Sequence, residues 1–223
     1  MADIILLRPT VAPSLPVATT DYEKQYQDQY SNILRLYFNQ LDAFTRALAG
    51  TDGGSSLTFP HIAASDTTDQ YASADNTPTI VQWNTLDSGS GFTLNPSFYA
   101  VAAYKGIYKI DFSLQFANTD NTQHDVDVWL RVNGTDVVGS TSKFSIPARK
   151  SAGVYTFIVA YSSVVFSVDV GDQIALWWAT DKAYSTTGPV NGIYMEYQAA
   201  QTVPYAHPSV PSAIGSITFV SAS

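Results

Sequence analysis

The pattern of apolar and polar positions changes character near residue 50. Between residues 30 and 48, large apolar side chains recur at spacings of four and three residues, as on one face of an α-helix. From about residue 77 onward, apolar and polar residues alternate in short runs separated by Gly, Asn and Asp, which is typical of β-strands and turns. The pattern therefore predicts one helix followed by a β-rich domain.

The predicted helix carries the seam of a coiled coil. Its apolar positions fit the a and d sites of about three heptads, and a helix this short is marginal alone in water. Thr20 and Glu23 have capping-box spacing and predict its start, and Gly50 predicts its end. Ile33, Leu36 and Phe38 broaden the apolar face, which favours a three-stranded coil, or a stem partly covered by the N-terminal arm, over a helix packed on its own domain. We expect residues 20–50 to form a trimer stem with the seam Tyr30, Leu34, Tyr37, Leu41, Phe44 and Leu48.

Prolines recur in the first 19 residues of the chain. Proline removes a backbone donor and fixes φ, so this segment is expected to be extended and polyproline-like. Two interpretations stay open, a disordered tail and a docking arm. A run of four aliphatic residues favours the arm, because disordered tails are usually less apolar. Within this arm, residues 1–19, the residues expected to dock on a partner are Ile4, Ile5, Leu6, Leu7, Pro9, Pro13 and Pro16.

The β-rich part begins with TPTIVQWN at Thr77 and contains about eight strands without an intervening helix. The clearest strand is GIYKIDFSLQF, which starts at Gly106 and places large apolar residues on one face. Asn133–Gly134 predicts a hairpin turn, and Gly171–Asp172 joins two longer apolar strands. The series predicts a mainly β fold, an antiparallel jelly-roll sandwich over residues 77–223, with residues 51–76 as a linker.

Tryptophans stand at positions that should face away from the core of this sandwich. Trp129 and Arg131 alternate out of phase with the aliphatic residues around them, and one of the adjacent pair Trp177 and Trp178 must point outward. Exposed tryptophan is typical of protein interfaces, and the alternative is cover by a loop. The candidates for an interface of the head are Trp129, Arg131, Trp177 and Trp178.

Charge and composition restrict the partners. The net charge is −8 and the pI is about 4.5, so no basic stripe can neutralise nucleic-acid phosphates. Only 13% of residues are charged, against about 25% in typical proteins, which indicates a polar, weakly charged surface. The chain lacks cysteine, which excludes disulfides and thiolate metal sites. The apolar run Ile4–Leu7 is too short for a signal peptide or a membrane span, so we expect a soluble cytosolic product without a membrane partner.

Catalytic and metal-binding patterns are weak. His61, His124 and His207 are far apart in sequence and have no zinc-site spacing. The chain has no nucleophile-elbow motif or phosphate-binding glycine loop. The Asp120–Asp127 loop could hold calcium, but it lacks EF-hand spacing, and a solvated hairpin is favoured. We expect no enzyme activity, no cofactor and no metal.

Three motifs of the β-rich part resemble the jelly-roll heads of the complement and tumour-necrosis-factor superfamily. They are GIYKIDFSLQF, VDVWLRVNGTDV and SVDVGDQIALWW. The whole chain also resembles small trimeric virion structural proteins of tailed bacteriophages. That resemblance rests on the proline-rich start, LRLYFNQLD, DQYASADNTPTIVQWN and HPSVPSAIGSITFV, which occur in this order.

The resemblance implies a homotrimer whose heads pack around a threefold axis through one sheet face. It also implies a virion protein, made in the host cytoplasm, whose partners are itself and the major capsid protein or another virion protein. A short chain without a long shaft favours a capsid decoration, cement or head-fibre protein. The alternatives are a short tail fibre or receptor-binding protein that recognises a host-surface glycan, and a cellular complement-like trimeric ligand, against which the lack of cysteine and of a signal peptide counts.

Overall fold

A computed structural model describes residues 11, 13–17, 20–49, 59–185 and 191–222. The chain divides into two compact units, Met1–Thr58 and Phe59–Ser223, and the second unit is the head. No helix in the described part of the chain has the length and hydropathy needed to cross a membrane.

The described residues of the first unit include the helix α1 (Lys24–Ala49). The helix begins later than the capping-box spacing predicted. The carbonyl of Glu23 accepts a hydrogen bond from the amide of Gln27 at 3.2 Å, so Glu23 itself occupies the N-cap position and Thr20 lies outside the helix. The predicted end is consistent with α1, although Gly50 lies outside the described residues.

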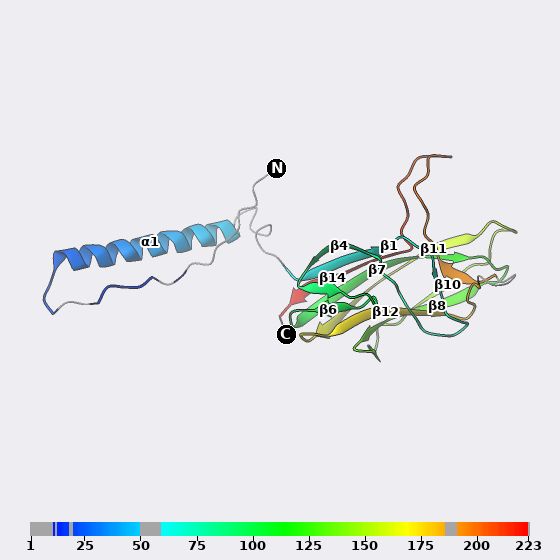
Figure 1. The fold of residues 1–223 in the computed structure, drawn as a ribbon, viewed down its shortest axis with the longest axis horizontal. Helices are drawn as coiled ribbons and strands as arrows, with labels where there is room; N and C mark the ends of the chain where they lie inside the picture. Colours follow the sequence, from blue (N-terminus) through cyan, green and yellow to red (C-terminus); the bar gives the residue numbers. More distant parts are fainter. Residues whose placement is uncertain (1–10, 12, 18–19, 50–58, 186–190, 223) are drawn as a thin grey trace. The chain divides into compact units, whose positions relative to one another are not determined.

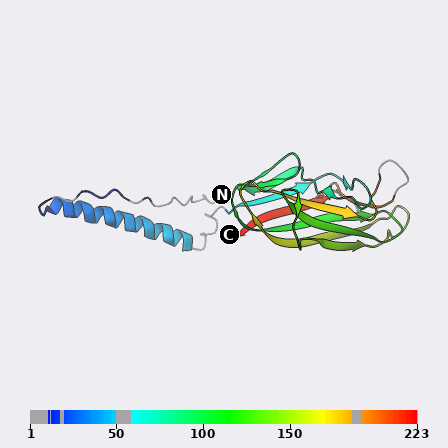
Figure 2. The same cartoon turned by 90° about the horizontal axis from the view of Figure 1, so that it is seen from below.

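The head is a sandwich of two antiparallel sheets, seen from two sides in Figures 1 and 2. Sheet A comprises β1 (His61–Asp66), β2 (Gln70–Tyr71), β4 (Thr85–Ser90), β7 (Gly106–Asn118), β11 (Thr156–Val168), β13 (Ile193–Met195) and β14 (Ala213–Ser221). Sheet B comprises β3 (Thr79–Ile80), β5 (Phe92–Leu94), β6 (Ala100–Ala102), β8 (His124–Val132), β9 (Thr135–Asp136), β10 (Ser142–Ile146) and β12 (Gln173–Thr180).

The order of strand pairing defines a jelly roll. Four antiparallel pairs are nested along the chain: β1 with β14, β6 with β12, β7 with β11, and β8 with β10. The pairs alternate between sheet A and sheet B, so the folded-over chain wraps around one core. The predicted mainly β jelly-roll fold with one helix is confirmed.

The core lies between β7 on one side and β8 and β12 on the other. Inward-facing residues of β7 are buried at every second position, whereas the intervening positions are half-buried, as a period of two requires. The Asn133–Gly134 turn between β8 and β9 has positive φ at both residues, the geometry of a type I′ hairpin turn. The buried side chains of the three strands include Tyr108, Phe112, Leu114, Phe116, Val126, Val128, Leu130, Ile174, Leu176 and Trp178.

The predicted linker, residues 51–76, is partly a strand. Its residues 61–66 form β1, which pairs with β14 on one side and β4 on the other, so the head begins near Phe59 rather than Thr77. Most residues of β1 are small, and the strand lacks the large alternating side chains that signal β7. The predicted first strand is reduced to the two residues of β3.

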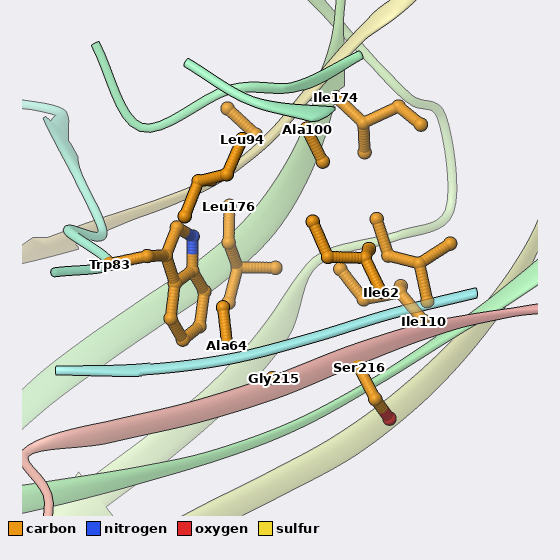
Figure 3. A pocket seen from close by; sticks show the side chains of 12 residues that line it. Ile62, Ala64, Trp83, Leu94, Ala100, Ile110, Ile174, Leu176, Gly215 and Ser216 are labelled. Atoms are coloured by element: carbon orange, nitrogen blue, oxygen red, sulfur yellow. The ribbon is translucent and has the colours of Figure 1, made fainter. Parts of the chain in front are cut away.

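Small residues in sheet A make room for Trp83. A Cβ atom added to Gly215 of β14 would lie 2.7 Å from Cη2 of the Trp83 indole, and Figure 3 shows this ring beside Gly215. The adjacent cavity has a volume of about 30 Å³ and an almost entirely apolar lining. That is room for about one or two waters, so this cavity is a packing defect of the core and not a ligand site.

This contact gives a prediction about packing. Gly215→Ala should destabilise the head by about 1–3 kcal/mol, because the new methyl group overlaps the indole. Gly89→Ala is the matched control, since its Cβ would meet no atom closer than 3.6 Å. Thermal unfolding followed by circular dichroism checks both variants, and equal melting temperatures for the two would contradict the close approach of Trp83.

Candidate functional site

The predicted stem residues share one face of α1. All six are half-buried, while most of their neighbours on the helix are exposed. Leu36 and Phe38, which broaden the apolar face, remain exposed. Within the first unit the helix therefore keeps an incompletely covered apolar face, which is the surface a coiled-coil partner would occupy.

The described part of the arm lies alongside this helix. The hydroxyl of Tyr26 donates to the carbonyl of Pro16 at 3.4 Å, and Pro13 and Pro16 are half-buried. Val11 and Val17 are exposed, the latter by 89%. The other predicted docking residues, Ile4, Ile5, Leu6, Leu7 and Pro9, lie outside the described residues.

Three of the predicted interface residues form a cluster on the outer face of sheet B. The guanidinium of Arg131 lies 4.3 Å from the ring centre of Trp177 and 5.6 Å from that of Trp129, so cation–π attraction holds it against both rings. Asp136 accepts hydrogen bonds from Nε1 of Trp129 at 2.7 Å and from Nε of Arg131. The three side chains are half-buried, and Asp136 satisfies the Nε1 donor of Trp129 and the Nε donor of Arg131. The buried Nε1 of Trp177, by contrast, has no hydrogen-bond partner among the described residues.

Trp178 does not belong to this surface. Its side chain is fully buried and its ring lies 5.4 Å from that of Phe116 across the core. Adjacent strand residues face opposite sides of a sheet, and here Trp177 takes the outer side. Trp178 is therefore a core residue of the head and not an interface residue.

The sandwich has an exposed row of apolar side chains on sheet A that the sequence analysis missed. Phe157, Val159, Tyr161 and Val165 share the outer face of edge strand β11 and are each about half exposed or more, and Ile214 of β14 adds to the same face. We call these five residues the sheet A stripe. Such a contiguous patch is typical of an interaction site. The signal was present in the sequence, because TFIVAYSSVVFSV is apolar on both faces of the strand.

A polar pair accompanies the stripe. Nζ of Lys109 lies 2.9 Å from Oδ1 of Asp111 on β7, and the Tyr161 hydroxyl donates to the same carboxylate at 3.1 Å. Burial acts to raise the pKa of Asp111, but hydrogen bonds from Lys109, Tyr161 and Ser163 outweigh it and lower the pKa. An ordered ion pair within an apolar face adds little net affinity for a partner. It does fix the register in which a partner binds.

The remaining candidate residues are His124 and the carboxylates of the Asp120–Asp127 loop, which belong neither to the sheet B cluster nor to the sheet A stripe. His124 contacts Oδ2 of Asp120 at 2.9 Å through Nε2 and Asp181 at 3.3 Å through Nδ1. Asp125 pairs with Lys143 at 3.3 Å, so the loop carboxylates are matched by basic side chains. The described residues contain no group of three or more His, Cys, Asp or Glu side chains placed to hold a metal ion. The calcium alternative for this loop therefore gains no support from the geometry.

Comparisons with known proteins show no family for this chain. No family model matches the chain, and no curated protein matches it. Solved structures similar to the chain include the Eiger TNF of S. frugiperda, at 10% identity and a TM-score of 0.46, covering 75% of this chain and 96% of that one. Another is the globular domain of zebrafish complement 1qA protein, at 11% identity and a TM-score of 0.41, covering 74% of this chain and 100% of that one. At such identities the likeness concerns the jelly-roll fold alone.

The His124 cluster predicts how the head responds to acid. The hydrogen bond from His124 is the main cause that lowers the pKa of Asp120 below its usual 3.8. A depressed pKa contributes stability above the ordinary value that is lost as the pH falls through the folded-state value. Asp120→Asn should therefore destabilise the head at neutral pH and much less at about pH 3, as measured by urea unfolding.

The partner residue supplies the control. His124→Gln removes the main cause of the Asp120 shift, so adding Asp120→Asn to that variant should have a smaller effect than in the parent. An Asp120→Asn effect of the same size at both pH values would show that this carboxylate contributes nothing through its charge.

Proposed function

We propose that this protein is a non-enzymatic structural protein of a tailed-bacteriophage virion. In this proposal it is a homotrimer whose N-terminal arm holds it to the capsid and whose jelly-roll head is displayed outward, as a capsid decoration, cement or head-fibre protein. The virion origin is supported by the four ordered motifs described above. Capsid attachment is a hypothesis about the arm, and self-association is supported by the surfaces of the stem and head.

The observation that carries the proposal is the presence of two incompletely covered apolar surfaces, one in each unit. The seam of α1 is only half-buried, and the sheet A stripe exposes side chains such as Tyr161 by 60%. Burial of exposed apolar area is the main driving force of association. A second copy of the same chain offers matching surfaces of both kinds, because a symmetric oligomer repeats each patch in every subunit.

Three copies fit these surfaces better than two. A broad apolar face that includes Leu36 and Phe38 needs more than one neighbouring helix to cover it. A threefold axis beside sheet A would bring three copies of the stripe together, with the Lys109–Asp111 pairs fixing their register. We therefore propose β11, β7 and β14 of sheet A as the head interface, and the sheet B residues Trp129, Arg131 and Trp177 remain the alternative.

The tail-fibre alternative differs only in the attachment site and in what the head binds. A receptor-binding tip would use the same trimer, present in far fewer copies on each particle. The number of copies per virion, measured by quantitative gel analysis of purified particles, separates the two functions, because a decoration protein is present in hundreds of copies.

Disruption of the seam tests the trimer. Leu41→Asp places a carboxylate on the half-buried face of α1, where desolvation of three such charges should cost several kcal/mol per trimer. Gln40→Asp is the matched control, since Gln40 is exposed beside it. Sedimentation velocity should show a dissociating or loosened assembly for Leu41→Asp and an intact trimer for Gln40→Asp.

A second variant identifies which unit holds the trimer together. If Leu41→Asp leaves the trimer intact while Val159→Asp in the sheet A stripe dissociates it, the head trimerises without the stem. A parent protein that sediments as a monomer at micromolar concentration would overturn the homotrimer altogether.

Deletion of the arm tests the attachment. Removal of residues 2–18 leaves α1, which begins at Lys24, and every strand of the head in place. The truncated protein should keep its thermal stability but fail to bind virions that lack the protein. Three arms per trimer act together, so a weak single-arm contact becomes strong through effective concentration. Full occupancy by the truncated protein would assign attachment to the stem or head.

A further inference from the structure

Three tyrosines from distant parts of the sequence meet at the β2–β13 end of sheet A. The ring centres of Tyr71 and Tyr184 are 5.6 Å apart, those of Tyr71 and Tyr194 are 5.6 Å apart, and those of Tyr184 and Tyr194 are 5.2 Å apart. Tyr194 is buried beneath the others, whereas Tyr71 is 38% exposed. The cluster therefore exposes part of the Tyr71 ring to solvent, while the Tyr194 ring that it packs against is buried.

A groove of about 520 Å³ runs beside this cluster. Residues 71–75 form one wall and residues 182–185 form the other. The rings of Tyr71 and Tyr184 stack on each other, with centres 5.6 Å apart. Ala72 and Ala183, whose side chains are buried, also line the groove. Ser73, Asp75 and Lys182 supply polar groups along the same groove. The lining thus combines two aromatic rings with several hydrogen-bonding side chains.

The first wall is fixed by its own hydrogen bonds. The amide of Ser73 donates to the Thr79 hydroxyl at 3.0 Å, and the amide of Asn76 donates to the carbonyl of Thr180 at 2.7 Å. The carboxylate of Asp75 accepts from the amide of Ala183 at 2.8 Å and so ties one wall to the other. A preformed groove avoids the ordering cost that a flexible loop would incur on binding.

The electrostatics of the groove favour a neutral ligand. Asp75 and Lys182 lie 3.4 Å apart as an ion pair and cancel each other's charge. The chain as a whole carries a net charge of −8, which disfavours polyanions. Burial and the neighbouring Asp69 raise the pKa of Tyr71 to about 12, so its phenol stays protonated and uncharged at physiological pH.

We propose that this tyrosine groove, bounded by Tyr71 and Tyr184 and crossed by the Asp75–Lys182 pair, binds a neutral saccharide. A pyranose ring has a face of C–H groups, which packs on an aromatic ring, and a rim of hydroxyls, which both donate and accept hydrogen bonds. The carboxylate of Asp75 accepts from such hydroxyls, and the ammonium of Lys182 donates to them.

The groove is independent of the proposed attachment function, because it involves neither the arm, nor α1, nor the sheet A stripe. Saccharide binding is therefore testable on the purified full-length protein without virions. Loss of self-association or of capsid binding would leave this inference standing, and loss of saccharide binding would leave the attachment function standing.

The experiment is saturation-transfer NMR with the full-length protein. The probes are neutral di- to tetrasaccharides built from glucose, galactose, mannose or N-acetylglucosamine, together with an oligosialic acid and a heparin oligosaccharide as charged probes. At least one neutral probe should receive saturation, strongest at its ring C–H protons. Tyr184→Ala should weaken its affinity about tenfold, and Ala74→Trp, which fills the groove from its exposed rim, should abolish the signal.

Tyr205→Ala is the matched control, because Tyr205 is 70% exposed and does not line the groove. This variant should bind like the parent, and thermal unfolding establishes that all three variants are folded. The proposal is overturned if no neutral probe receives saturation, if only the charged probes do, or if folded Tyr184→Ala and Ala74→Trp both bind like the parent.

Discussion

The head depends on the pairing of strand β7 along both of its edges. All 13 residues of β7 pair with β11 on one side, and β14 and β13 share the other side. Its inner face, from Tyr108 to Phe116, is buried against sheet B. Because each backbone amide and carbonyl in the core must find a partner, this strand sets the register of three neighbours at once. The jelly-roll order follows, because the chain crosses to sheet B between these strands and β11 and β14 then pair with β7 in sheet A.

The same pairing creates the surfaces on which the proposed functions rest. β11 pairs with β7 along its whole length, and no sheet A strand formed by the described residues pairs with its other edge. Its outer face keeps apolar side chains in solvent. β13 ends beside β2 and brings Tyr194 against Tyr71. One end of sheet A therefore carries an aromatic groove, and the edge strand carries an apolar stripe. Association and ligand binding can thus occupy different parts of one rigid sandwich.

The stem helix differs from the head in how its apolar residues are covered. α1 has apolar residues at heptad spacing, and the described residues of its unit contain no sheet or second helix to cover them. Helical stability in proteins comes mainly from packing of the apolar face, which is the reason for proposing a partner surface for this helix. The head buries its own core and the stem does not, and this contrast is the physical basis for assigning self-association to the stem as well as to the sheet A stripe.

The sequence by itself determined the elements whose signal is local. Period-two alternation located β7, Asn133–Gly134 located the hairpin turn, and heptad spacing located α1, because each pattern reflects the geometry of a single element. Only the tertiary structure decided what depends on distant neighbours. It showed that the small residues of β1 form a strand paired on both edges, that Trp178 rather than Trp177 enters the core, and that α1 begins after Glu23 rather than after Thr20. It also brought Tyr71, Tyr184 and Tyr194 together, since strand pairing across more than a hundred residues leaves no trace in the local pattern.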